Sequence, residues 1–143
     1  MSIWKTIVVG VDGSPNSRTA LTWAAAEAAD HGADLVVINV WEHTLPPPTG
    51  SVSVSERHVP DPSQRTAEDL VKLIKDVLGE DPLVVVQPHV KQGNPAKVLI
   101  EQSADADLLV VGPRGHGGFL GLVLGSVSQH VAAYAKCPVT VVR

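Results

Sequence analysis

The amino-acid sequence predicts an α/β fold, in which an open, doubly wound parallel sheet has helices on both faces. Segments rich in β-branched residues alternate with helical patterns along the chain, and this alternation is typical of doubly wound folds. Most of these segments are continuously apolar, as expected for strands buried on both faces. Three of the helical patterns begin at a proline that follows a serine, aspartate or asparagine, which is a helix-start signal.

We expect five strands. They share a run of β-branched and other apolar residues, and in chain order they are 6–11, 35–40, 83–87, 108–112 and 139–142. Pro88 directly follows the third of these segments. Because proline cannot donate a hydrogen bond to a neighbouring strand, we expect the third strand at an edge of the sheet.

Four helices are expected between the strands. The first, rich in alanine, covers about 15–30, and the others begin at Pro62, at Pro95 and close to Ser126. The second carries apolar residues at the i, i+3, i+4, i+7 spacing of an amphipathic helix. Residues 42–60 contain four prolines and no helical stripe. They form either a lid over a ligand or a solvated linker, and both interpretations stay open.

Length and composition predict one domain over residues 1–143, since 44% of the residues are hydrophobic and can form a core. The net charge of −4 gives no general attraction to nucleic acid or anionic membranes. No apolar run is long enough to span a bilayer. The first apolar run is too short for a secretion signal, and the single cysteine favours a reducing compartment. We therefore expect a cytoplasmic protein that binds neither nucleic acid nor membrane.

The sequence gives no sign of a protein metal site. The six histidines show no helical i, i+4 spacing, and no cysteine or carboxylate cluster joins them. No catalytic residue is indicated either, because no run matches a nucleophile elbow, Gly-x-Ser-x-Gly.

A glycine-rich segment, GPRGHGGFLGLVLGSVSQ, occupies residues 112–129 between the fourth strand and the fourth helix. Backbone amides of such a loop, together with a helix N-terminus, form an anion site. The segment lacks the Walker lysine, because Gly118 stands there, and it lacks the third glycine of the dinucleotide fingerprint, because Leu120 stands there. What remains is Gly112-x2-Gly115-x9-Gly125-Ser126. A flexible loop without a ligand is the alternative.

Each residue of this spacing fits contact with a nucleotide. Gly112 lets a ribose or base edge approach the strand end, and Gly115 lets the loop turn with its amides inward. Gly125 and Ser126 open a helix whose amides and hydroxyls can hold phosphate oxygens.

Three further residues of the segment are candidates. Arg114 and His116 could add positive charge beside a phosphate. Ser128 can contact phosphate, cap the helix, or do both.

The spacing, the N-terminal VVGVDGSPNSRTAL and the C-terminal CPVTVVR together resemble the universal stress protein family over the whole chain. The resemblance implies a five-stranded parallel sheet of strand order 3-2-1-4-5. It also implies ATP binding in the crevice between the first and fourth strands, and a homodimer that forms through the last strand, 139–142.

The resemblance also implies which residues bind the nucleotide. Asp12 would lie beside the adenosine, with Val11 next to it, and Val40 would contact adenine through its backbone. The ribose and phosphates would be lined by Gly112, Gly115, Gly125, Ser126, Val127 and Ser128. This chain departs from the family pattern at Pro113, which removes one amide donor beside Gly112.

We therefore expect an ATP-binding regulator of a stress response, homodimeric and with little or no turnover. Magnesium is expected on the phosphates, because the loop has no lysine to neutralise them. Two alternatives remain open. One is a slow ATPase or another enzyme of adenosine-phosphate chemistry, and the other is a dimerising interaction module without nucleotide.

Overall fold

A computed structural model describes residues 4–42, 62–113 and 125–143 of the chain. Strands and helices alternate along it, as expected. They are β1 (Thr6–Gly10), α1 (Pro15–His31), β2 (Asp34–Trp41), α2 (Pro62–Leu78), β3 (Val86–Gln92), α3 (Pro95–Ser103), β4 (Leu108–Val111), α4 (Ser126–Tyr134) and β5 (Val139–Val141). The strands form one parallel sheet in the order β3-β2-β1-β4-β5. The predicted fold class and strand order are confirmed.

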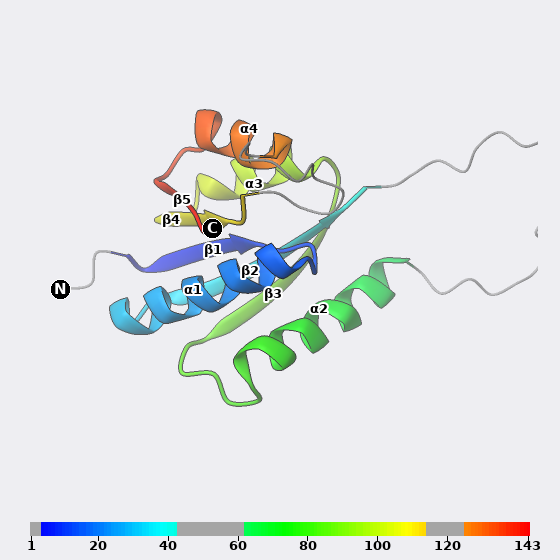
Figure 1. The fold of residues 1–143 in the computed structure, drawn as a ribbon, viewed down its shortest axis with the longest axis vertical. Helices are drawn as coiled ribbons and strands as arrows, with labels where there is room; N and C mark the ends of the chain where they lie inside the picture. Colours follow the sequence, from blue (N-terminus) through cyan, green and yellow to red (C-terminus); the bar gives the residue numbers. More distant parts are fainter. Residues whose placement is uncertain (1–3, 43–61, 114–124) are drawn as a thin grey trace, which may run out of the picture.

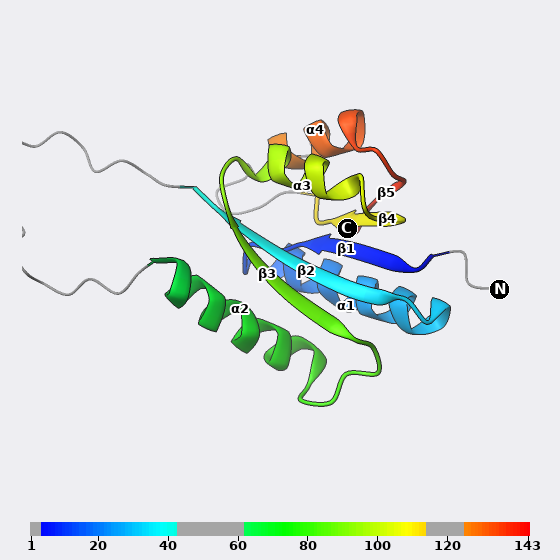
Figure 2. The ribbon, with the colours of Figure 1, turned by 180° about the vertical axis from the view of Figure 1, so that it is seen from behind.

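Helices cover both faces of this sheet. Figures 1 and 2 show α1 and α2 on one face and α3 and α4 on the other. The residues of β1 alternate between two cores: Ile7 and Val9 pack beneath α1 and α2, whereas Val8 packs beneath α3 and α4. The same alternation in β2 and β4 explains why these strands are apolar without interruption.

The helix-start signals work as the sequence predicts. The Ser14 hydroxyl accepts a hydrogen bond from the Ser17 amide at 3.3 Å, and the Asn94 side chain accepts one from the Lys97 amide at 3.1 Å. Pro15 is the first residue of α1, where a missing amide hydrogen costs nothing. These caps start α1 and α3 directly after the ends of β1 and β3.

The predicted bounds of the third strand were wrong. The strand covers 86–92, whereas the apolar run suggested 83–87. Leu83 and Val85 precede it, with 94% and 61% of their surface exposed. An edge strand packs less completely than a central one, so β3 tolerates polar residues. Because of these residues, the strand does not form a continuous apolar run in the sequence. Pro88 lies within β3, and the predicted edge position is confirmed.

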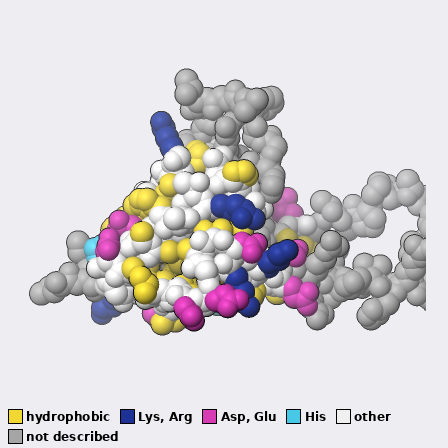
Figure 3. All heavy atoms as spheres, turned by 60° about the horizontal axis from the view of Figure 1, so that its bottom comes forward, with side chains coloured by type: hydrophobic (Ala, Val, Ile, Leu, Met, Phe, Trp, Pro, Cys, Tyr) yellow, Lys and Arg dark blue, Asp and Glu magenta, His cyan; other side chains and the backbone are white. Residues whose placement is uncertain are grey.

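The surface around α2 carries both signs of charge. Asp69, Lys72, Lys75 and Asp76 of this helix are all exposed. Figure 3 views the molecule from the side on which α2 lies in Figure 1, and it shows acidic and basic side chains next to one another there. Within the described part of the chain, no helix is long and apolar enough to cross a membrane.

A carboxylate joins the starting ends of two central strands. One oxygen of Asp107, the residue before β4, accepts hydrogen bonds from the amides of Lys5 and Thr6, both at 2.9 Å. These two bonds lower the pKa of the Asp107 carboxyl. The Asp107 charge also adds to the effect of burial in raising the pKa of the Cys137 thiol. Asp107 is not among the residues predicted from the sequence.

Replacement of Asp107 tests this link. We expect Asp107→Ala to lower the free energy of unfolding at pH 7 by about 1 kcal/mol, the typical value of a hydrogen bond that is partly open to solvent. Because folding lowers the pKa, the contribution is complete above the unfolded pKa of about 3.9 and is lost as the pH falls through the folded value. Urea denaturation of wild type and variant from pH 7 to pH 3 measures both effects.

Asp105→Ala is the matched control, because Asp105 is exposed and lies two residues away. Equal losses for Asp105→Ala and Asp107→Ala, or a difference between wild type and Asp107→Ala that does not shrink in acid, would contradict the assignment.

Candidate functional site

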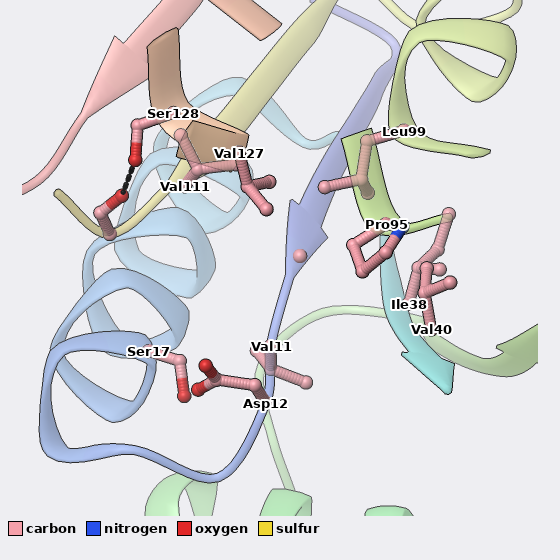
Figure 4. Close-up of a pocket in the computed structure, with 12 residues that line it drawn as sticks. Val11, Asp12, Ser17, Ile38, Val40, Pro95, Leu99, Val111, Val127 and Ser128 are labelled. Carbon is pink, nitrogen blue, oxygen red and sulfur yellow. Dashed lines mark hydrogen bonds between the residues drawn. The ribbon is translucent and has the colours of Figure 1, made fainter. Parts of the chain in front are cut away.

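A pocket of about 130 Å³ opens at the carboxyl ends of β1, β2 and β4. Figure 4 shows Ile38, Val40, Pro95 and Leu99 on one side of it and Val111, Val127 and Ser128 on the other. The pocket therefore lies between the central strands and the helices α3 and α4. Ligands of open α/β sheets bind at this kind of position, where the chain leaves neighbouring strands toward opposite faces.

The structure brings together many of the residues predicted to form the site. Those that line the pocket are Val11, Asp12, Val40, Gly112, Val127 and Ser128. Gly125 is the capping residue before α4. Ser126 lines a neighbouring groove rather than the pocket itself. Arg114, Gly115 and His116 lie outside the described residues, as does most of the 42–60 segment.

Other lining residues were not predicted. These are Gly10, Ser17, Ile38, Pro95, Leu99 and Val111. Most are apolar and stand at strand ends or in the first turns of helices, where their spacing is the same as that of core residues. One signal could have indicated them: they lie at or after the carboxyl ends of strands, where ligands of open α/β sheets bind.

A wider groove of about 420 Å³ adjoins the pocket and shares Val40, Pro95 and Val127 with it. The groove runs along the starts of α3 and α4. Its polar residues include Ser126 and His130, and Nδ1 of His130 lies 2.8 Å from the Ser126 carbonyl oxygen. A ligand in the pocket can thus extend along two helix N-termini.

The end of β1 is held by hydrogen bonds from its neighbours. The Val11 amide donates to the Ile38 carbonyl at 2.9 Å, and the Asn39 side-chain amide donates to the Val11 carbonyl at 3.0 Å. Asp12 accepts a hydrogen bond from the Ser14 amide at 2.9 Å, so its carboxylate closes the turn into α1 while remaining exposed. Asn39 is not among the residues predicted from the sequence, although it is the polar residue within the apolar run of β2.

The described residues on either side of the glycine loop are hydrogen-bonded to each other. The Gly125 amide donates to the Pro113 carbonyl at 2.6 Å. The Ser128 hydroxyl lies 2.9 Å from the Gly112 carbonyl and 2.8 Å from the Pro113 carbonyl, and Figure 4 draws the first of these bonds. Ser128 has only 2% of its surface exposed. Its hydroxyl therefore holds the loop ends in this structure.

The N-terminus of α4 differs from those of α1 and α3. No side chain caps α4, because Gly125 stands at the capping position. Ser14 and Asn94 cap the other two helices. The first amides of a helix need acceptors, and an anion can supply them.

The described residues contain no group of three or more His, Cys, Asp or Glu side chains that could hold a metal ion. Asp12 is the carboxylate that lines the pocket among these residues. The chemistry of the described site is therefore that of an apolar pocket with hydrogen-bonding groups at its rim.

The comparisons with known proteins agree with this arrangement. The sequence model of the universal stress protein family matches residues 4–143. The chain belongs to this family. A universal stress protein of Mycolicibacterium smegmatis is 38% identical over 142 residues, covering 96% of this chain and 45% of the relative. The chain thus spans about half the length of the curated relatives that it matches.

Solved structures of universal stress proteins have the same fold. One of them, in complex with cAMP, is 28% identical, has a TM-score of 0.66, and covers 98% of this chain and 97% of its own. Another, from Archaeoglobus fulgidus in complex with dAMP, is 22% identical with a TM-score of 0.67, and the match covers 99% of both chains. The second likeness concerns the fold alone.

The Ser128 contacts predict the effect of removing its hydroxyl. We expect Ser128→Ala to lower the free energy of unfolding by about 1–2 kcal/mol, because the Gly112 and Pro113 carbonyls share the one hydroxyl donor of Ser128 in a buried place and would lose it. Ser126→Ala is the control, since Ser126 begins the same helix with an exposed side chain. Urea denaturation of both variants provides the measurement. A loss for Ser128→Ala no larger than that for Ser126→Ala would show that the hydroxyl does not hold the loop ends.

Proposed function

We propose that residues 1–143 form a single nucleotide-binding domain that binds ATP and acts as a regulator of a stress response with little or no turnover. The observation that carries this proposal is the apolar pocket beside a helix N-terminus that lacks a side-chain cap. Such a pair of features suits a ligand with a flat apolar ring and a negative group. The cAMP complex of a relative supports an adenine nucleotide as this ligand.

The pocket is the proposed site of the base. Its volume, about 130 Å³, is below the range of roughly 300–1,000 Å³ of whole-ligand sites, so it suits a ring system alone. Ile38 and Leu99 offer apolar contact for a purine. The backbone of Val40 offers hydrogen-bonding groups for its polar edge, as the family resemblance implies.

The phosphates are proposed to lie at the start of α4. The amides of Ser126, Val127 and Ser128 begin this helix, and its dipole favours an anion. Arg114, Gly115 and His116 would complete the phosphate site from the loop. Mg²⁺ bound through the phosphates would neutralise part of their charge, because the loop has no lysine to do so.

Slow or absent turnover is proposed because the described site offers little to activate a nucleophile. Its carboxylate, Asp12, is hydrogen-bonded to the Ser14 amide. A slow ATPase or another enzyme of adenosine-phosphate chemistry is the alternative.

We also propose a cytoplasmic location, which the single cysteine supports because it favours a reducing compartment. The negative net charge and the mixed charges around α2 argue against nucleic acid or membrane as a partner.

Calorimetric titration of nucleotide-free protein with ATP and magnesium tests the proposal. We expect one site per chain for wild type and no measurable binding for Gly115→Val, whose side chain would block the inward turn of the loop. Phosphate release should stay far below the median enzyme rate of about 10 per second. Brisk hydrolysis would favour the enzyme alternative. Absence of binding, with unchanged thermal stability in excess ATP, would favour the nucleotide-free module.

We further propose a homodimer that forms through the C-terminal strand, predicted at residues 139–142 and present in the structure as β5 (Val139–Val141). This strand is an edge of the sheet, and it is short and apolar, so it leaves backbone groups for a second copy. The Leu109 amide donates to the Pro138 carbonyl and the Val142 amide to the Val111 carbonyl. Because alternate residues of a strand point their amides to opposite sides, the Val141 amide faces the open edge.

A proline at Val141 tests the dimer. Val141→Pro removes a donor from the open edge while it spares the bonds to β4, so we expect a folded monomer. Sedimentation velocity gives the mass, and circular dichroism checks the fold. Thr140→Pro is the control and should unfold the strand, because that amide faces β4. The dimer proposal fails if wild type sediments as a monomer, or if Val141→Pro remains a dimer.

A further inference from the structure

Two glycines beside the pocket have room for a side chain only if a neighbouring group shifts, and that group differs between them. A β-carbon on Gly112 would lie 3.2 Å from the carbonyl oxygen of Asn16, which belongs to helix α1. A β-carbon on Gly10 would lie 2.9 Å from Cδ1 and 3.2 Å from Cδ2 of Leu99. A methyl group at Gly112 would thus meet rigid backbone, whereas one at Gly10 would meet the end of a side chain that can rotate.

The surroundings of Leu99 determine where its side chain could move. Leu99 has 4% of its surface exposed and belongs to the core beneath α3 and α4. The same core contains Val8, Leu109 and Val131, all buried, and such interiors are packed too closely to accept another methyl group. The side of Leu99 that is not packed is the one that lines the pocket. A methyl group on Gly10 would therefore push the isobutyl group of Leu99 into the pocket.

We infer that the contact between Gly10 and Leu99 sets the depth of the pocket and thereby limits the base to adenine without an added alkyl group. This inference rests on the proposed function, because it assigns the pocket to the base of an adenine nucleotide. Leu99 occupies the space that a substituent on the inner edge of the ring would need. Gly10 is glycine because any side chain there would drive Leu99 into the space of the ring itself.

The first test changes the depth by adding and removing volume at the same contact. We expect Gly10→Ala to weaken binding of AMP, measured by calorimetry, on the order of tenfold, as one methylene in an apolar pocket typically does. Leu99→Val added to Gly10→Ala should recover most of this loss, because it makes room for the new methyl group. The two substitutions must then be non-additive, as expected for residues in contact.

The second test enlarges the pocket alone. The probes are AMP and three derivatives that carry an alkyl group at C2, N6 or C8 of the ring. Leu99→Val, and Leu99→Ala where it folds, should improve the binding of at least one derivative relative to AMP on the order of tenfold. Leu109→Val is the matched control, because Leu109 is buried in the same core but does not line the pocket. It should leave the preference unchanged.

The outcomes separate this inference from the proposed function. If wild type binds neither ATP nor AMP, the proposed function fails, and this inference fails with it. If wild type binds AMP but Gly10→Ala binds it equally well, or no Leu99 variant gains affinity for any derivative, the depth assignment alone is overturned. A gain with Leu109→Val equal to that with Leu99→Val would also overturn it, because general loosening of the core would then explain the effect.

Discussion

The position of β1 at the centre of the sheet is the constraint on which the rest of the structure depends. This strand pairs with β2 on one side and β4 on the other. The chain leaves β1 toward α1 on one face, whereas β3 and β4 lead into α3 and α4 on the opposite face. The helices therefore diverge at the carboxyl ends of β1 and β4. The space between them is the pocket, which side chains line without filling it.

Hydrogen bonds from side chains to the backbone hold the strand ends around this gap. Asn39 holds the Val11 carbonyl at the end of β1, and Ser128 holds the carbonyls of Gly112 and Pro113 after β4. Gly112 lies so close to Asn16 that only a residue without a side chain fits there without displacement. At the amino ends of these strands, Asp107 joins the start of β4 to the start of β1. Both ends of the central strand pair are thus fixed by polar groups.

The sequence predicts the fold well because its signals are local. Uninterrupted apolar runs specify strands buried on both faces, and the Ser14-Pro15 and Asn94-Pro95 pairs specify helix starts. It predicts β3 less well, because this edge strand is packed less completely and its polar residues resemble a loop. The glycine-rich segment leads to Gly112, Val127 and Ser128 of the pocket lining, but no sequence signal leads to Pro95 or Leu99. These two residues reach the pocket through tertiary packing, and their local pattern is that of any core helix.

The central claim is that the pocket between β1, β2, β4 and the two helices α3 and α4 holds an adenine ring. Intermolecular nuclear Overhauser effects between the adenine H2 and H8 protons and protein methyl groups, measured in the complex with ATP, test it most directly. We expect contacts to the methyl groups of Val40, Leu99 and Val127, which line the pocket. Bound ATP whose adenine protons contact only methyl groups outside the pocket, such as those of Val71 or Leu83, would contradict it.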